Sequence, residues 1–75
     1  KFDEALDIYN KILKQDNDNL SVIYNKSLLL ILMQRKEDAL KLLHRIVAKH
    51  PDHKKAKEKI HELAEDLDGA TPGGS

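Results

Sequence analysis

The side chains in this sequence that could bind a metal or move a proton are four histidines, His44, His50, His53 and His61. The sequence has no cysteine, and none of the histidines belongs to a His-Glu-x-x-His pattern. A metal site needs several ligands that converge and are held in place by further hydrogen bonds. We therefore interpret the histidines as solvent-facing side chains and expect no metal and no cofactor.

The run Asp16-Asn17-Asp18-Asn19 is a second group of metal-ligand types, since calcium loops alternate oxygen ligands. An EF-hand loop beginning at Asp16 would need glycine five residues later and glutamate eleven residues later. Ser21 and Ser27 occupy those positions, which excludes this type of site. Neither serine stands in a pattern that supplies a base and an orienting group for catalysis. The run is predicted to be a turn with helix-capping side chains, and the protein is predicted not to be an enzyme.

Length and charge narrow the function classes further. A chain of 75 residues forms one small domain, and its 13 basic and 13 acidic residues leave no net field to attract nucleic acid or an anionic membrane. The six-residue apolar run of residues 28–33 is far shorter than the roughly 20 residues that span a bilayer. Without cysteines we expect a reducing, cytoplasmic setting. Because the chain starts at Lys1 without a methionine, we expect it to be part of a longer protein.

The central stretch Leu20–Met33, LSVIYNKSLLLILM, is predicted to be a helix that needs cover on more than one side, because its second half is apolar all round. The stretches before and after it are amphipathic. Lys1 to about Gln15 carries apolar residues at the spacing of one helical face, with acids in its first turn and lysines in its last. Lys36 to Lys49 is predicted to be a third helix, stopped by Pro51.

A fourth helix is predicted after Asp52, which we expect to cap it. Its charges oppose the helix dipole, since lysines lie near its start and acids near its end, so packing must hold it. Ala56, Ile60, Leu63 and Leu67 are its expected buried residues. We place the domain at residues 1–68, with residues 69–75 as a flexible linker or tail rich in glycine.

Internal repetition organises these helices. Residues 3–8, DEALDI, superpose on residues 37–42, EDALKL, and Ala5 and Ala39 stand 34 residues apart. This is the period of tetratricopeptide repeats, and the chain resembles that family from Lys1 to about Leu67. The resemblance covers one full repeat, residues 20–53, flanked by two half repeats. It implies an all-α, right-handed solenoid of four helices paired as antiparallel hairpins. The family's pattern of small and large apolar residues is matched at these positions: Tyr24, Ser27, Leu30, Ala39, Leu43, Ile46 and Pro51.

Two positions depart from the family's pattern. Lys26 stands where the family often has leucine, and its aliphatic stem is expected to pass along the neighbouring Ser27. Gln34 stands where the turn between paired helices usually has glycine.

The resemblance also implies a concave groove lined by the first helix of each pair. It puts the following residues on the groove side: Ser21, Tyr24, Asn25, Leu28, Ile31 and Leu32. It puts these against the paired helices: Ile23, Ser27, Leu30 and Met33. Such grooves are usually polar, so the stripe Tyr24, Leu28, Ile31 and Leu32 would be an exposed apolar patch. The function predicted is a protein–protein interaction module that binds a peptide, an apolar helix or a second copy of itself. Alternatively, the fourth helix or a neighbouring repeat covers part of the patch.

Three residues suggest a more specific ligand. In members of the family that capture acidic C-terminal tails, an asparagine and two cations hold a carboxylate, and Asn25, Lys55 and Lys59 fall at corresponding positions. The match is partial, because position 59 is lysine where the family usually has arginine. In addition, the family's further cation and asparagine come from the preceding groove helix, which would lie before Lys1. A solvated basic face is the alternative interpretation of the two lysines.

The turn at Gln34-Arg35-Lys36 leaves a further alternative open. No glycine or proline interrupts Leu20–His50, and a left-handed residue other than glycine costs roughly 1–2 kcal/mol. Helices two and three could therefore merge and exchange between two chains, giving a swapped homodimer. The acids Glu37 and Asp38 instead favour a separate third helix.

Overall fold

The computed structural model describes residues 1–69, and within this range the chain forms four helices and no strand. The helices are α1 (Phe2–Gln15), α2 (Leu20–Leu32), α3 (Lys36–Lys49) and α4 (Lys54–Gly69). The predicted all-α fold of helical hairpins is confirmed, and each predicted helix lies within two residues of its expected bounds. Gly69, expected in the tail, is the last residue of α4, and residues 70–75 lie outside the described residues.

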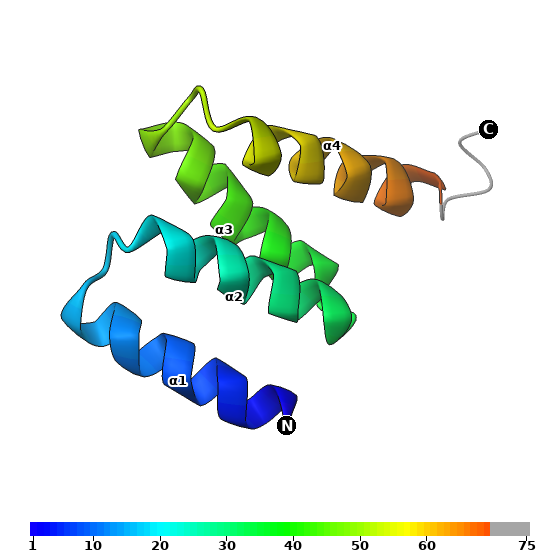
Figure 1. The fold of residues 1–75 in the computed structure, drawn as a ribbon. Helices are drawn as coiled ribbons and strands as arrows, with labels where there is room; N and C mark the ends of the chain where they lie inside the picture. Colours follow the sequence, from blue (N-terminus) through cyan, green and yellow to red (C-terminus); the bar gives the residue numbers. More distant parts are fainter. Residues whose placement is uncertain (70–75) are drawn as a thin grey trace.

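Successive helices run in opposite directions (Figure 1). The loops that follow α1 and α3 lie at one end of the molecule, and the turn between α2 and α3 lies at the other. α2 packs on both α1 and α3, and α3 packs on α4 as well. α2 therefore has neighbours on two sides, as its apolar sequence requires.

The core forms where α2, α3 and α4 meet. Its buried members come from all three helices: Ile23, Leu30, Ala39, Leu43, Ile46, Ala56 and Leu63. Small side chains allow close approach of the helices, because Ser27 of α2, Ala39 of α3 and Ala56 of α4 each have no exposed surface. The Ser27 hydroxyl donates to the Tyr24 carbonyl at 2.6 Å, so its burial leaves no polar atom unsatisfied.

The turn between α2 and α3 is a complete Schellman motif built around a glutamine. Gln34 has a φ of 65°, in the left-handed region that glycine adopts most easily. The Arg35 N–H donates to the Leu30 carbonyl at 2.8 Å, and the Gln34 N–H donates to the Ile31 carbonyl at 3.0 Å. These bonds satisfy carbonyls at the end of α2 that would otherwise lack partners.

The merged helix considered for a swapped dimer is therefore not formed. α2 ends at Leu32, and α3 returns beside it within the same chain (Figure 1). The Schellman bonds and the packing of α2 on α3 offset the cost of a left-handed glutamine. Glu37 and Asp38 occupy the first turn of α3, where acids stabilise a separate helix.

His53, and not Asp52, caps α4. The Ala56 N–H donates to His53 Nδ1 at 3.0 Å, and the Lys57 N–H donates to the His53 carbonyl at 3.2 Å. The prediction of an Asp52 cap was wrong by one residue, because capping preferences favour aspartate but only the position three residues before Ala56 has the right geometry. The predicted cap at the start of α2 is correct, since Asn19 Oδ1 accepts from the Val22 N–H at 3.1 Å.

The loop between α1 and α2 is fastened to α3. Asp18 forms an ion pair with Lys49, and Arg45 Nη2 donates to the Asn17 carbonyl at 3.3 Å. The hydrogen bond from Lys49 and its charge hold the pKa of the Asp18 carboxyl below its usual range. The acidic run thus serves as a structural connection between hairpins.

The composition of the core predicts that replacing two isoleucines that stand 34 residues apart will change the free energy of unfolding by very different amounts. Ile46 of α3 is 1% exposed, whereas Ile12 of α1 is 37% exposed. Ile46→Ala should lower the free energy of unfolding by about 2–5 kcal/mol through cavity formation, and Ile12→Ala should cost clearly less. Urea unfolding followed by circular dichroism measures both. Equal losses would contradict this assignment of the core.

The turn predicts a stabilising substitution. Gln34→Gly should raise the free energy of unfolding by about 0.5–1 kcal/mol, because glycine has no Cβ to clash in the left-handed region. Gln34→Val should lower it, since a β-branched side chain fits this region worst. Thermal and urea unfolding of the three proteins provide the comparison. A less stable glycine variant would show that the strain at Gln34 is small.

Candidate functional site

The outward side of α2 carries a strip of residues at helical spacing: Ser21, Asn25, Leu28 and Leu32. Ser21 and Asn25 are exposed, Leu28 is half-buried, and Leu32 is 64% exposed. We call these four residues the α2 strip. Leu32 is the most exposed of the large apolar side chains in residues 1–69, so the strip has an apolar end next to the α2–α3 turn.

Tyr24 and Ile31 were predicted to share this surface, and like Leu28 they are half-buried. Both side chains pack against the core cluster. The Tyr24 ring also lies beside the imidazole of His53, the residue that caps α4, with centroids 5.6 Å apart and planes at 39°. Of the four apolar residues of the predicted patch, Leu32 is therefore exposed and the other three are half-buried.

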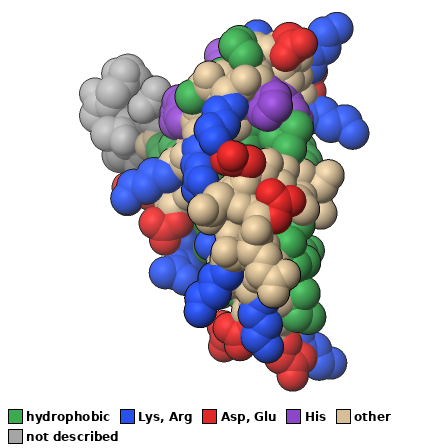
Figure 2. All heavy atoms as spheres, turned by 90° about the vertical axis from the view of Figure 1, so that its left-hand side faces the viewer, with side chains coloured by type: hydrophobic (Ala, Val, Ile, Leu, Met, Phe, Trp, Pro, Cys, Tyr) green, Lys and Arg blue, Asp and Glu red, His purple; other side chains and the backbone are tan. Residues whose placement is uncertain are grey.

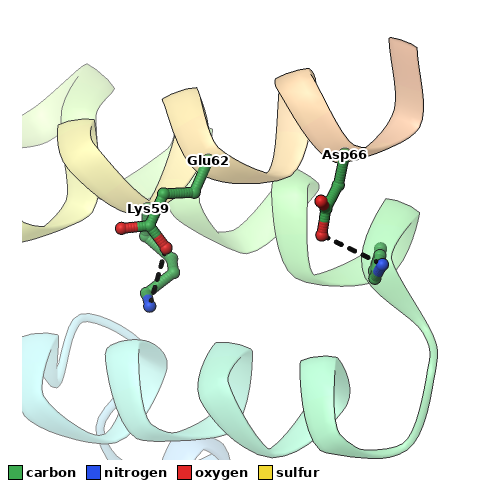
Figure 3. A network of polar contacts seen from close by, with 4 residues as sticks. Lys59, Glu62 and Asp66 are labelled. Atoms are coloured by element: carbon green, nitrogen blue, oxygen red, sulfur yellow. Dashed lines mark hydrogen bonds and ion pairs between the residues drawn. The ribbon is translucent and has the colours of Figure 1, made fainter. Parts of the chain in front are cut away.

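The two lysines of the predicted carboxylate site differ in their surroundings. Lys55 is exposed, whereas Lys59 is half-buried and its Nζ lies 3.2 Å from Glu62 Oε1. Figure 3 shows the Lys59 side chain extending from α4 toward α2, with Glu62 beside it. The side chains of Asn25 and Lys55 form no hydrogen bond or ion pair within residues 1–69. Lys59 therefore faces the space between α2 and α4, with its charge already partly balanced.

A second ion pair fixes the far end of α4. Lys36 Nζ, at the start of α3, lies 3.1 Å from Asp66 Oδ2 (Figure 3). This pair joins the two helices near the end of the described chain, where α4 has few deeply buried side chains. Exposed pairs of this kind contribute at most about 1 kcal/mol each, so this one adds little to the stability given by the core.

The surface charges are mixed. Figure 2 views the end that carries the two loops and shows basic and acidic side chains interspersed over it, with apolar side chains gathered along one edge. This end of the molecule therefore carries no patch of a single charge sign. No helix within residues 1–69 has the length and apolar character needed to cross a bilayer.

The histidines lie in different surroundings. His61 lies 3.4 Å from Glu65 on the exposed side of α4, and His53 caps α4. Among the described residues, no group of three or more histidine, aspartate or glutamate side chains could hold a metal ion. Sequence reasoning did not foresee the contact between His53 and Tyr24, because nothing in the repeat pattern marks a loop histidine as a partner for an aromatic ring.

Comparison with known families matches residues 1–60 to the tetratricopeptide repeat. The match covers α1, α2, α3 and the first half of α4, and it agrees with the hairpin geometry described above. The chain belongs to the tetratricopeptide repeat family. Repeats of this family are generally non-catalytic scaffold modules that bind protein partners. No curated protein and no solved structure gives a significant match to the chain.

The two roles of His53 can be separated by substitution. His53→Ala removes the cap and should lower the free energy of unfolding by about 1 kcal/mol. His53→Asn replaces the Nδ1 acceptor with an amide oxygen that can accept from the Ala56 N–H but loses the ring contact with Tyr24, so it should recover most of that loss. Urea unfolding at neutral pH measures the difference. If both variants lose the same free energy, the ring contact and not the cap is the stabilising interaction.

Proposed function

We propose that this protein is a protein–protein interaction module that binds a peptide or an apolar helix along the surface between α2 and α4. The observation that carries the proposal is the exposure of Leu32, 64%, at the end of a strip that otherwise follows one side of α2. A single exposed leucine is unremarkable, but Leu28 stands one turn before it on the same side. Two leucines at this spacing match the anchors of a helix that packs in a groove.

The proposed contact residues keep the set predicted from the sequence: Tyr24, Asn25, Leu28, Ile31, Leu32, Lys55 and Lys59. Leu28 and Leu32 supply apolar contact area, while the amide of Asn25 is free to hydrogen-bond a peptide backbone. Tyr24 and Ile31 support the floor from the core side. Lys55 and Lys59 add positive charge on the opposite wall, which favours a partner with an acidic side chain or an acidic C-terminus.

A second copy of the chain is the alternative partner for the same surface. Leu28 and Leu32 of two molecules could pack against one another in a symmetric homodimer. Sedimentation across a range of concentrations distinguishes the cases, since a strict monomer removes self-association and leaves a separate peptide as the partner.

The surface is tested by selecting binders from a displayed peptide library and measuring their affinity for variants. Leu32→Lys should weaken the binding of the selected peptides by at least about tenfold, because it places a charge among the apolar contacts. Helicity should be unchanged, since Leu32 is exposed. Ile8→Lys is the matched control, because Ile8 is 56% exposed on α1 and lies outside the proposed surface.

The ligand class follows from the selected sequences. Peptides with leucine, isoleucine or phenylalanine at helical spacing support the apolar groove, whereas peptides that share an acidic C-terminus and are sensitive to Lys59→Gln support the carboxylate site. Equal loss of affinity in Leu32→Lys and Ile8→Lys would contradict both, because it would show that binding is not located between α2 and α4.

A further inference from the structure

A separate hollow lies on another side of the molecule, where α1, α2 and α3 meet. It has a volume of about 280 Å³ and is lined by residues of all three helices and the turn before α3. Leu6 of α1 and Leu42 of α3 form its accessible apolar part, and Leu30 of α2, a core residue that is 5% exposed, lies at its base. We call it the three-helix hollow. Its volume is close to the lower end of the range for small ligand sites, enough for two or three side chains.

Lys26 gives this hollow its character. It is the only charged residue of α2, it is half-buried, and its side chain forms no ion pair or hydrogen bond within residues 1–69. It precedes Leu28 by two residues, which places it about 160° around the helix from that leucine. The hollow is therefore distinct from the surface between α2 and α4. Because the ammonium group has no charge partner in the described chain, an anion that reaches it can form a charge-assisted hydrogen bond with it.

The rim of the hollow adds positive charge. Lys41 of α3 is exposed and likewise has no ionic or hydrogen-bonded partner in the described chain. The one acid of the lining, Asp38, is already paired, because Arg35 Nε lies 3.4 Å from its Oδ2. The hollow thus offers two unpaired cations, with the carboxylate that could have neutralised them engaged elsewhere.

We propose that the three-helix hollow binds an acidic-aliphatic peptide segment, whose carboxylate lies between Lys26 and Lys41 and whose neighbouring aliphatic side chains pack on Leu6 and Leu42. The charge complementarity selects the carboxylate, and the two accessible leucines select aliphatic neighbours over a bare anion. A phosphate chain fits less well, since it has no apolar group to cover the leucines.

The proposal is tested with the full chain and short capped peptides. Titration of the ¹⁵N-labelled protein with acetyl-Ala-Leu-Glu-Leu-Ala-amide should shift the amide signals of Leu6, Leu30 and Leu42 in a saturable way. Replacing the glutamate of the peptide with glutamine should weaken binding by at least about tenfold, the effect of losing a charge-assisted hydrogen bond. Replacing its leucines with serine should also weaken it. A short oligothymidylate should not compete.

Three protein variants locate the site. Lys41→Gln should weaken binding of the peptide by about tenfold. Lys57→Gln removes the same charge from the exposed side of α4 and should leave binding unchanged. Lys26→Leu should abolish binding while leaving the melting temperature no lower, because leucine suits the apolar surroundings of that position. Leu32→Lys should have no effect, which separates this site from the one between α2 and α4.

Several results would overturn the proposal. These are the absence of saturable shifts, equal binding of the glutamine peptide, equal losses in Lys41→Gln and Lys57→Gln, or displacement by oligothymidylate. Retained binding in Lys26→Leu would also overturn it. None of these results bears on the surface that contains Leu32, whose test uses different ligands and a different variant.

Discussion

The structure depends on one constraint, which is that α2 is apolar on nearly every side and has to be covered without being enclosed. α3 covers it through close packing that small side chains permit: Ser27 and Ala39 are both fully buried. α1 covers a second side. On a third side, Tyr24 and Ile31 are partly buried because they pack against the core cluster. What remains uncovered is the strip that ends at Leu32, together with the position of Lys26. Both proposed binding surfaces are therefore parts of the same helix that its neighbours leave open.

Most of the fold could be predicted from the sequence because it follows from repetition. The 34-residue spacing of Ala5 and Ala39, together with apolar residues at helical intervals, was enough to predict four helices and their pairing. The family match over residues 1–60 rests on the same pattern. Some helix bounds were also predictable, since Asn19 caps the start of α2 and Pro51 follows the end of α3.

The details that sequence could not predict are those decided by contacts between distant residues. The left-handed conformation of Gln34 is unfavourable locally and persists because the packing of α2 on α3 holds the turn closed. The cap of α4 moved from Asp52 to His53 because geometry, not residue preference, selects the acceptor. The predicted apolar stripe treated its four residues as exposed, whereas Tyr24, Leu28 and Ile31 are half-buried, and His53 at the start of α4 lies against Tyr24. Periodicity identifies a face but not how far a neighbour extends over it.

α1 differs from the other helices in one respect that bears on how the molecule behaves in time. None of its residues is fully buried. Within residues 1–69, α2 is the one helix on which α1 packs substantially. Local opening follows the number of buried apolar contacts, so α1 detaches at a lower free energy than α3, and its amides exchange with solvent sooner. Because Leu6 of α1 forms part of the three-helix hollow, the hollow disappears whenever α1 opens. Phe2 of α1 lines a different hollow, beside Leu32, so the apolar end of the α2 strip also changes when α1 opens.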